Sequence, residues 1–116
     1  MAFSLVWTAE AAEQYASLRE NAAASLEARK ESQKNKAGKT EGLFKQVHKS
    51  IQNLANNPKH PGLQSHEFTA LAHPYKNGEK VFEAYAQHRT PGAYRVFWCY
   101  GPEKGELTII SITPHP

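Results

Sequence analysis

Apolar residues recur along this chain with helical spacing in the first half and with strand-like spacing in the second. A run of large apolar side chains at residues 3–7 comes first and predicts a short β-strand. From Thr8 the chain is rich in Ala, Glu, Lys and Gln and has neither Pro nor Gly before Gly38. We therefore expect a helix that begins after Thr8 as its N-cap, a break between Gly38 and Gly42, and a second helix over residues 43–56.

The second half of the chain predicts β-structure. Stretches of β-prone residues alternate with turn-forming ones, and Asn77-Gly78 and Pro91-Gly92 are typical of hairpin turns. Because strands this close in sequence pair most easily with their neighbours, an antiparallel meander is expected. The predicted strands cover residues 66–71, 81–88, 93–100 and 106–113.

These elements predict a single α+β domain over residues 1–116. It consists of an N-terminal strand, a helical hairpin and then the antiparallel meander, with the helices packed on one face of the sheet. In the strand over residues 93–100, large apolar side chains occur at both alternating sets of positions, so the sequence does not tell which face is buried. Arg95 lies in the middle of this strand and needs a partner or a purpose there.

The composition indicates a basic region of the chain and the expected cellular compartment. The formal net charge is +3, and much of the excess comes from seven Lys and Arg residues between positions 29 and 49. These belong either to a solvated helical hairpin or to a surface that faces phosphate or an acidic partner. Cys99 is the only cysteine and no apolar run is long enough to span a membrane, so we expect a cytoplasmic protein without membrane contact.

Four stretches of the second half form a recognisable series: LANNPKHPGLQSHEF, VFEAYAQ, GAYRVFWCY and LTIISITPHP. They resemble the RelE/ParE-type toxins of bacterial toxin–antitoxin systems, and the match spans about residues 43–116. The resemblance implies a small basic toxin that cleaves mRNA in the ribosomal A site without a metal ion or a cofactor. The ParE branch of the family instead inhibits DNA gyrase. The implied partners are a cognate antitoxin, the ribosome and mRNA.

Cleavage of RNA without a metal moves the 2′-hydroxyl onto the adjacent phosphorus. This chemistry needs groups that take and give protons, and positive charge on the phosphate. Arg95 matches the strand arginine that the family uses on the phosphate, although an ion pair with Glu83 on the next strand would explain it without catalysis. His115 matches the basic or histidine position near the family's C-terminus and is a candidate general acid, or else an exposed terminus. His88 completes the catalytic candidates, which are Arg95, His115, His88 and Glu83.

A second set of residues is placed to bind RNA. Basic side chains flank the two hairpin turns, where the alternative is a solvated turn, and a strand tyrosine can either stack on a base or belong to the core. These candidates are Arg89, Lys76, Lys80, Tyr85 and His66. No metal site is expected, because the spacing of the histidines fits no standard ligand pattern and the chain contains no Asp.

Three functions remain open at this point: an mRNA endoribonuclease, a gyrase inhibitor without catalytic groups, and an inactive member that only binds a partner. The histidines favour the first, because a gyrase binder has no need of proton-transfer groups. The relevant histidines are His66, His88 and His115.

Overall fold

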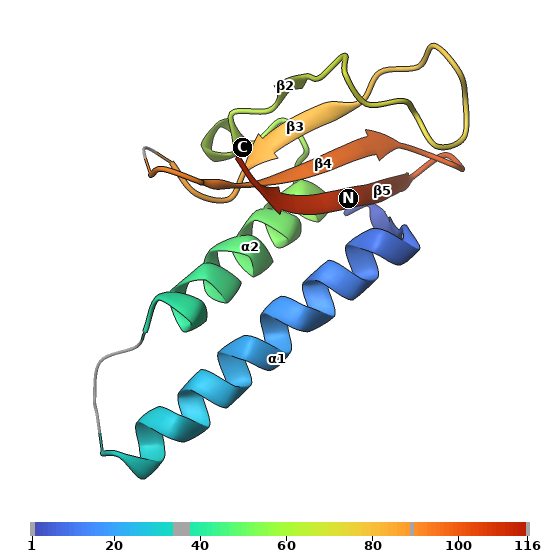
Figure 1. Ribbon diagram of the computed structural model, residues 1–116. Helices are drawn as coiled ribbons and strands as arrows, with labels where there is room; N and C mark the ends of the chain where they lie inside the picture. The colour runs from blue at the N-terminus through green and yellow to red at the C-terminus, as the bar shows by residue number, and fades with distance from the viewer. Residues whose placement is uncertain (1, 34–37, 89, 116) are drawn as a thin grey trace.

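Two helices and five strands form two layers in the computed structural model, which describes residues 2–33, 38–88 and 90–115 (Figure 1). The helices form a hairpin that projects well beyond the sheet, so the molecule is elongated, 51 × 26 × 25 Å. In chain order the elements are β1 (Ser4–Trp7), α1 (Ala9–Glu31), α2 (Lys39–Asn56), the 3₁₀ turn η1 (Pro61–Leu63), β2 (His66–Glu67), β3 (Phe82–Tyr85), β4 (Tyr94–Tyr100) and β5 (Glu106–Pro114).

The α+β class is confirmed, but the sheet is mixed rather than wholly antiparallel. Its strand order is β1-β5-β4-β3-β2, and the pairs β2–β3, β3–β4 and β4–β5 are antiparallel. β1 pairs parallel with β5, with Ser4 opposite Glu106 and Trp7 opposite Ile109. The sequence of an isolated four-residue strand does not indicate which strand it will pair with. Here the helical hairpin returns the chain so that β1 joins the strand farthest from it in sequence.

The helix starts follow from local hydrogen bonding. Thr8 is the N-cap of α1 as predicted, since its Oγ1 accepts a hydrogen bond from the Ala11 N–H at 3.0 Å. The same hydroxyl donates to the Ile110 carbonyl at 2.6 Å and so ties the helix to β5. α2 begins four residues earlier than predicted and includes Gly42, because the Glu41 carboxylate accepts from the Gly38 N–H at 3.1 Å and stabilises the first turn.

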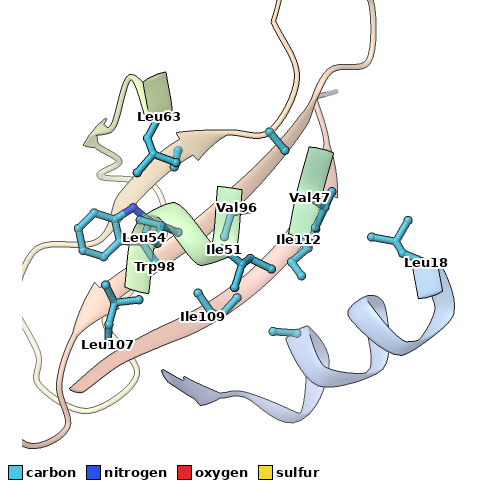
Figure 2. Packing of buried hydrophobic residues seen from close by; sticks show 13 residues of the cluster. Leu18, Val47, Ile51, Leu54, Leu63, Val96, Trp98, Leu107, Ile109 and Ile112 are labelled. Carbon is cyan, nitrogen blue, oxygen red and sulfur yellow. The ribbon is translucent and has the colours of Figure 1, made fainter. Parts of the chain in front are cut away.

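One face of the sheet, the inner face, packs against the two helices. α2 supplies Val47, Ile51 and Leu54, and β4 supplies Val96 and Trp98. Figure 2 shows these side chains together with Leu107, Ile109 and Ile112 of β5, and Leu18 of α1 lies at the edge of the same cluster. The question that the alternation in β4 left open is therefore settled: the even-numbered residues from 94 to 98 face the helices.

The opposite face, the outer face, carries its own smaller apolar cluster. It contains Val81, Phe97, Cys99 and Ile110, and Phe68 packs against it from the loop after β2. The predicted strand over residues 66–71 is only two residues long. The Phe68 N–H still donates to the Val81 carbonyl at 2.8 Å, and Phe68 and Leu71 then pack on this face.

A β-bulge in β5 redirects the side chains near the end of the chain. Phe97 lies opposite Ser111, whereas the next residue, Trp98, lies opposite Ile109, so Ile110 is the extra residue. Strict alternation would put Ile112 and Ile109 on opposite faces, yet both belong to the inner cluster. The shift directs Thr113, the register partner of Arg95, toward the outer face.

Candidate functional site

A buried ion pair lies on the outer face where β2, β3 and β4 meet. The Arg95 Nη1 donates to Glu83 Oε2 at 2.5 Å, and His66 Nε2 lies 2.8 Å from Glu83 Oε1. Glu83 is only 3% exposed and Arg95 only 8%, whereas the His66 side chain is half exposed. The ion pair considered as an alternative for Arg95 is thus present, and it links to a histidine that reaches solvent.

Aromatic rings hold the Arg95 guanidinium in place. Its Cζ lies 4.8 Å from the centroid of the Phe97 ring and 6.0 Å from that of Phe68. Cation–π attraction of this kind is stronger when the cation is desolvated, as it is here. The Arg95 Nε has no hydrogen-bond partner among the described residues, so the guanidinium keeps a donor that the fold does not use.

Tyr85 connects this ion pair to a second histidine. Its ring centroid lies 5.8 Å from that of His66 and 5.9 Å from that of His88. Burial, followed by the negative charge of Glu83, raises the pKa of the Tyr85 phenol. Tyr85 and His88 line a cavity of about 250 Å³ together with Gln64, Gln87 and Ala93.

The end of the chain approaches the same cavity. The His115 N–H donates to the Ala93 carbonyl at 2.8 Å and thereby extends the β4–β5 ladder by one residue pair. His115 is exposed and follows Thr113 by two residues, so the alternation assigns it to the outer face beside Arg95. Contacts thus join Arg95, Glu83, His66, Tyr85 and His88, and the strand register adds His115 at the same end of β3 and β4. We name these six residues the outer-face cluster.

Two of the predicted RNA-binding residues lie elsewhere. Lys76 and Lys80 line a different hollow of about 710 Å³, which they share with Tyr75 and Tyr100. The Lys76 Nζ lies 3.8 Å from the Glu79 carboxylate, and both side chains are exposed. Arg89 lies outside the described residues. The structure thus joins His66 and Tyr85 to the catalytic candidates and separates the two lysines from them.

Several residues at the site were not predicted from the sequence. Gln64 lines the cavity and has a left-handed backbone conformation, with φ of 48°. This conformation is uncommon for a residue other than glycine, so the sequence does not predict it. Phe68 follows His66 by two positions and its N–H donates to the Val81 carbonyl at 2.8 Å, so its ring lies on the outer face near Arg95. Thr113 faces outward because of the bulge at Ile110, and β-bulges have no reliable sequence pattern.

Two histidines outside the cluster stabilise turns. His60 Nδ1 accepts from the Gly62 N–H at 3.0 Å, and His73 Nδ1 accepts from the Tyr75 N–H at 3.1 Å. Within the part of the chain that the structure describes, no group of three or more His, Cys or Glu side chains is placed to hold a metal ion. Neither described helix combines the length and the apolar composition needed to cross a membrane.

Comparisons with known proteins leave the site to be interpreted from its geometry. No family model matches the chain, and no curated protein or solved structure matches it either.

Proposed function

We propose that this protein is a RelE/ParE-type toxin that cleaves mRNA on the ribosome without a metal ion. The observation that carries the proposal is the outer-face cluster: one arginine, one carboxylate and three histidines from β2, β3, the segment after β3, β4 and the residue after β5. Histidine side chains can exchange protons near neutral pH, and a guanidinium matches two phosphate oxygens. The cluster therefore supplies the groups required for attack of a 2′-hydroxyl on the adjacent phosphorus.

The proposed reaction breaks one P–O bond and forms another within the same RNA strand. The 2′-oxygen attacks the adjacent phosphorus while its proton passes to a base, and the 5′-oxygen leaves with a proton from an acid. The products are a 2′,3′-cyclic phosphate and a 5′-hydroxyl. His88 and His115 are exposed on the cluster and serve as the proton-transfer pair, while Arg95 stabilises the charge on the phosphorane.

Glu83 acts as a positioning residue in this scheme. One of its oxygens accepts from Arg95 and the other lies against His66, so both are engaged within the fold. A carboxylate in this position fixes the guanidinium and orients the imidazole. Tyr85, flanked by two histidine rings, is the side chain placed to stack on a base.

The partners follow from the same proposal. The protein acts in the cytoplasm on ribosome-bound mRNA, and a cognate antitoxin neutralises it by covering its surface. The arrangement of a helical hairpin under strands β2 to β5, paired in chain order, supports a RelE-like fold.

A second candidate is a toxin that binds its target without catalysis, such as a gyrase inhibitor. The observation that favours it is the burial of Arg95 in an ion pair, because a guanidinium that serves only the fold has no need of a substrate. In that case the exposed histidines would be ordinary surface residues.

Primer extension on translated mRNA separates the two candidates. The protein, its Arg95→Ala variant and its His88→Ala and His115→Ala variants are expressed, and the 5′ ends of a reporter mRNA are mapped. We expect cuts with the unaltered protein and with a His48→Gln control, whose histidine lies on α2 away from the cluster, and a loss of at least tenfold in the three variants. Growth arrest with intact mRNA and inhibited supercoiling would replace the endoribonuclease with the gyrase inhibitor.

A further inference from the structure

A pocket of about 370 Å³ opens beyond the C-terminal end of α2, beside the inner face of the sheet. Its aromatic wall consists of Phe82, Trp98 and Tyr100, and Pro58 and Pro61 line it from the segment after α2. This volume lies within the range of sites that take small ligands, and the wall is largely apolar, as such sites are. The pocket shares neither its aromatic wall nor its prolines with the outer-face cluster.

Two polar atoms at this pocket lack a hydrogen-bond partner among the described residues. They are Trp98 Nε1 and Ser65 Oγ, and both residues line the pocket. Trp98 is only 2% exposed, and its ring lies at the margin of the apolar cluster beyond Leu54 (Figure 2). An indole N–H can only donate and a buried donor without a partner costs free energy, so a ligand that brings a hydrogen-bond acceptor to this atom would be stabilised.

The aromatic wall favours a flat ligand. The Phe82 and Trp98 rings stack with centroids 4.7 Å apart and planes 22° apart, and Tyr100 meets Trp98 edge-on at 5.1 Å. Tyr100 is 40% exposed and lies at the open side of this group. A planar ring that enters the pocket finds ring surfaces to pack on and a donor within the wall.

One short segment borders both this pocket and the cavity beside the outer-face cluster. Gln64 lines both this pocket and the 250 Å³ cavity beside Tyr85 and His88. Two residues further along, His66 contacts Glu83. Lys59 adds a positive charge to the pocket lining. This shared segment is the route by which an RNA strand bound at the cluster would bring a neighbouring nucleotide to the pocket.

We propose that this pocket binds one base of the RNA, next to the nucleotides that are cut. The inference rests on the RNA-cleaving function proposed above. A purine or pyrimidine is a planar ring with ring-nitrogen or carbonyl acceptors, so it offers stacking to the aromatic wall and an acceptor to Trp98 Nε1. Ser65 Oγ is the second group that pairs with the base edge.

The test is an NMR titration of the indole N–H signals in the unaltered protein. The chain has two tryptophans, and a Trp7→Phe variant assigns the signal of Trp98. The four ribonucleoside 5′-monophosphates are added one by one, with ribose 5-phosphate as the control for the sugar and phosphate. We expect a saturable shift of the Trp98 signal with at least one nucleotide, no shift with ribose 5-phosphate, and an unmoved Trp7 signal.

Two exposed tyrosines provide a matched pair of variants. Tyr100→Ala removes a ring from the pocket wall and should weaken nucleotide binding at least about fivefold, whereas Tyr75→Ala, outside the wall, should leave it unchanged. The proposal is overturned if no nucleotide shifts the Trp98 signal, if ribose 5-phosphate shifts it equally, or if the indole contacts only a bound water. If the unaltered protein cuts mRNA but binds no nucleotide at Trp98, the base pocket is refuted and the cleavage function stands. If it binds a nucleotide there but cuts no mRNA, the cleavage function is refuted.

Discussion

The buried contact between Glu83 and Arg95 yields the sharpest stability prediction. Replacing Glu83 with Ala leaves a guanidinium in a site where Arg95 is 8% exposed, with two aromatic rings beside it and no counter-charge. Breaking one half of a buried ion pair costs about 3–5 kcal/mol. That is a large part of the roughly 5–15 kcal/mol that holds a domain of this kind folded. Arg95→Ala should cost a similar amount, because it strands the carboxylate.

Urea denaturation followed by circular dichroism measures this effect. With a slope of about 1–3 kcal/mol per molar, either single variant should lower the midpoint by at least about 1 M. The matched control is the double variant Glu83→Leu with Arg95→Met, in which no charge is stranded and which we expect to unfold near the unaltered protein. The contact of His66 with Glu83 adds little, because the His66 side chain is half exposed. Single variants that cost less than about 1 kcal/mol would show that solvent screens the pair and would refute the argument.

Three further predictions concern the helical hairpin and the core. The Arg29 guanidinium, 2.8 Å away, and the Gly38 N–H lower the pKa of the Glu41 carboxyl to about 2. The contribution of this carboxylate to stability is therefore present above its unfolded pKa and is lost as the pH falls through about 2. Glu41→Gln should lower the melting temperature at pH 7 but not at pH 2, and an equal loss at both pH values would contradict this. Burial raises the pKa of the Cys99 thiol to about 11, so a disulfide reagent at pH 8 should label it only after unfolding, and rapid labelling of the folded protein would be inconsistent with the burial described. Leu54→Ala, at a fully buried position, should cost about 2–5 kcal/mol in urea unfolding, against no measurable cost for the exposed Gln52→Ala.

Local physics made the elements predictable. Helix-forming composition and the Thr8 cap determine where α1 begins, and glycine-containing turns separate the strands. These properties act over a few residues, so they can be read from the chain directly. The α+β class followed from the order of the elements, and the ion pair between Glu83 and Arg95 was among the alternatives because their strands are neighbours in sequence.

Long-range pairing could not be predicted in the same way. Nothing in β1 indicates that it pairs parallel with β5, because any exposed strand edge offers the same hydrogen bonds. The bulge at Ile110 reverses the faces of the residues that follow it, so the outward position of Thr113 depends on one inserted residue. Lys76 and Lys80 were grouped with the RNA-binding residues on their position at a turn, yet that turn faces a different hollow.

The chemistry of the RNA ends tests the central claim most directly. Purified protein is added to a cell-free translation system, and the cut mRNA is recovered and its termini are analysed. Attack by the 2′-hydroxyl predicts a 2′,3′-cyclic phosphate on one fragment and a 5′-hydroxyl on the other, with both products lost in the His88→Ala/His115→Ala double variant, whose changes are at exposed positions. Fragments that end in a 3′-hydroxyl and a 5′-phosphate, or an mRNA that stays intact while translation proceeds, would contradict the account.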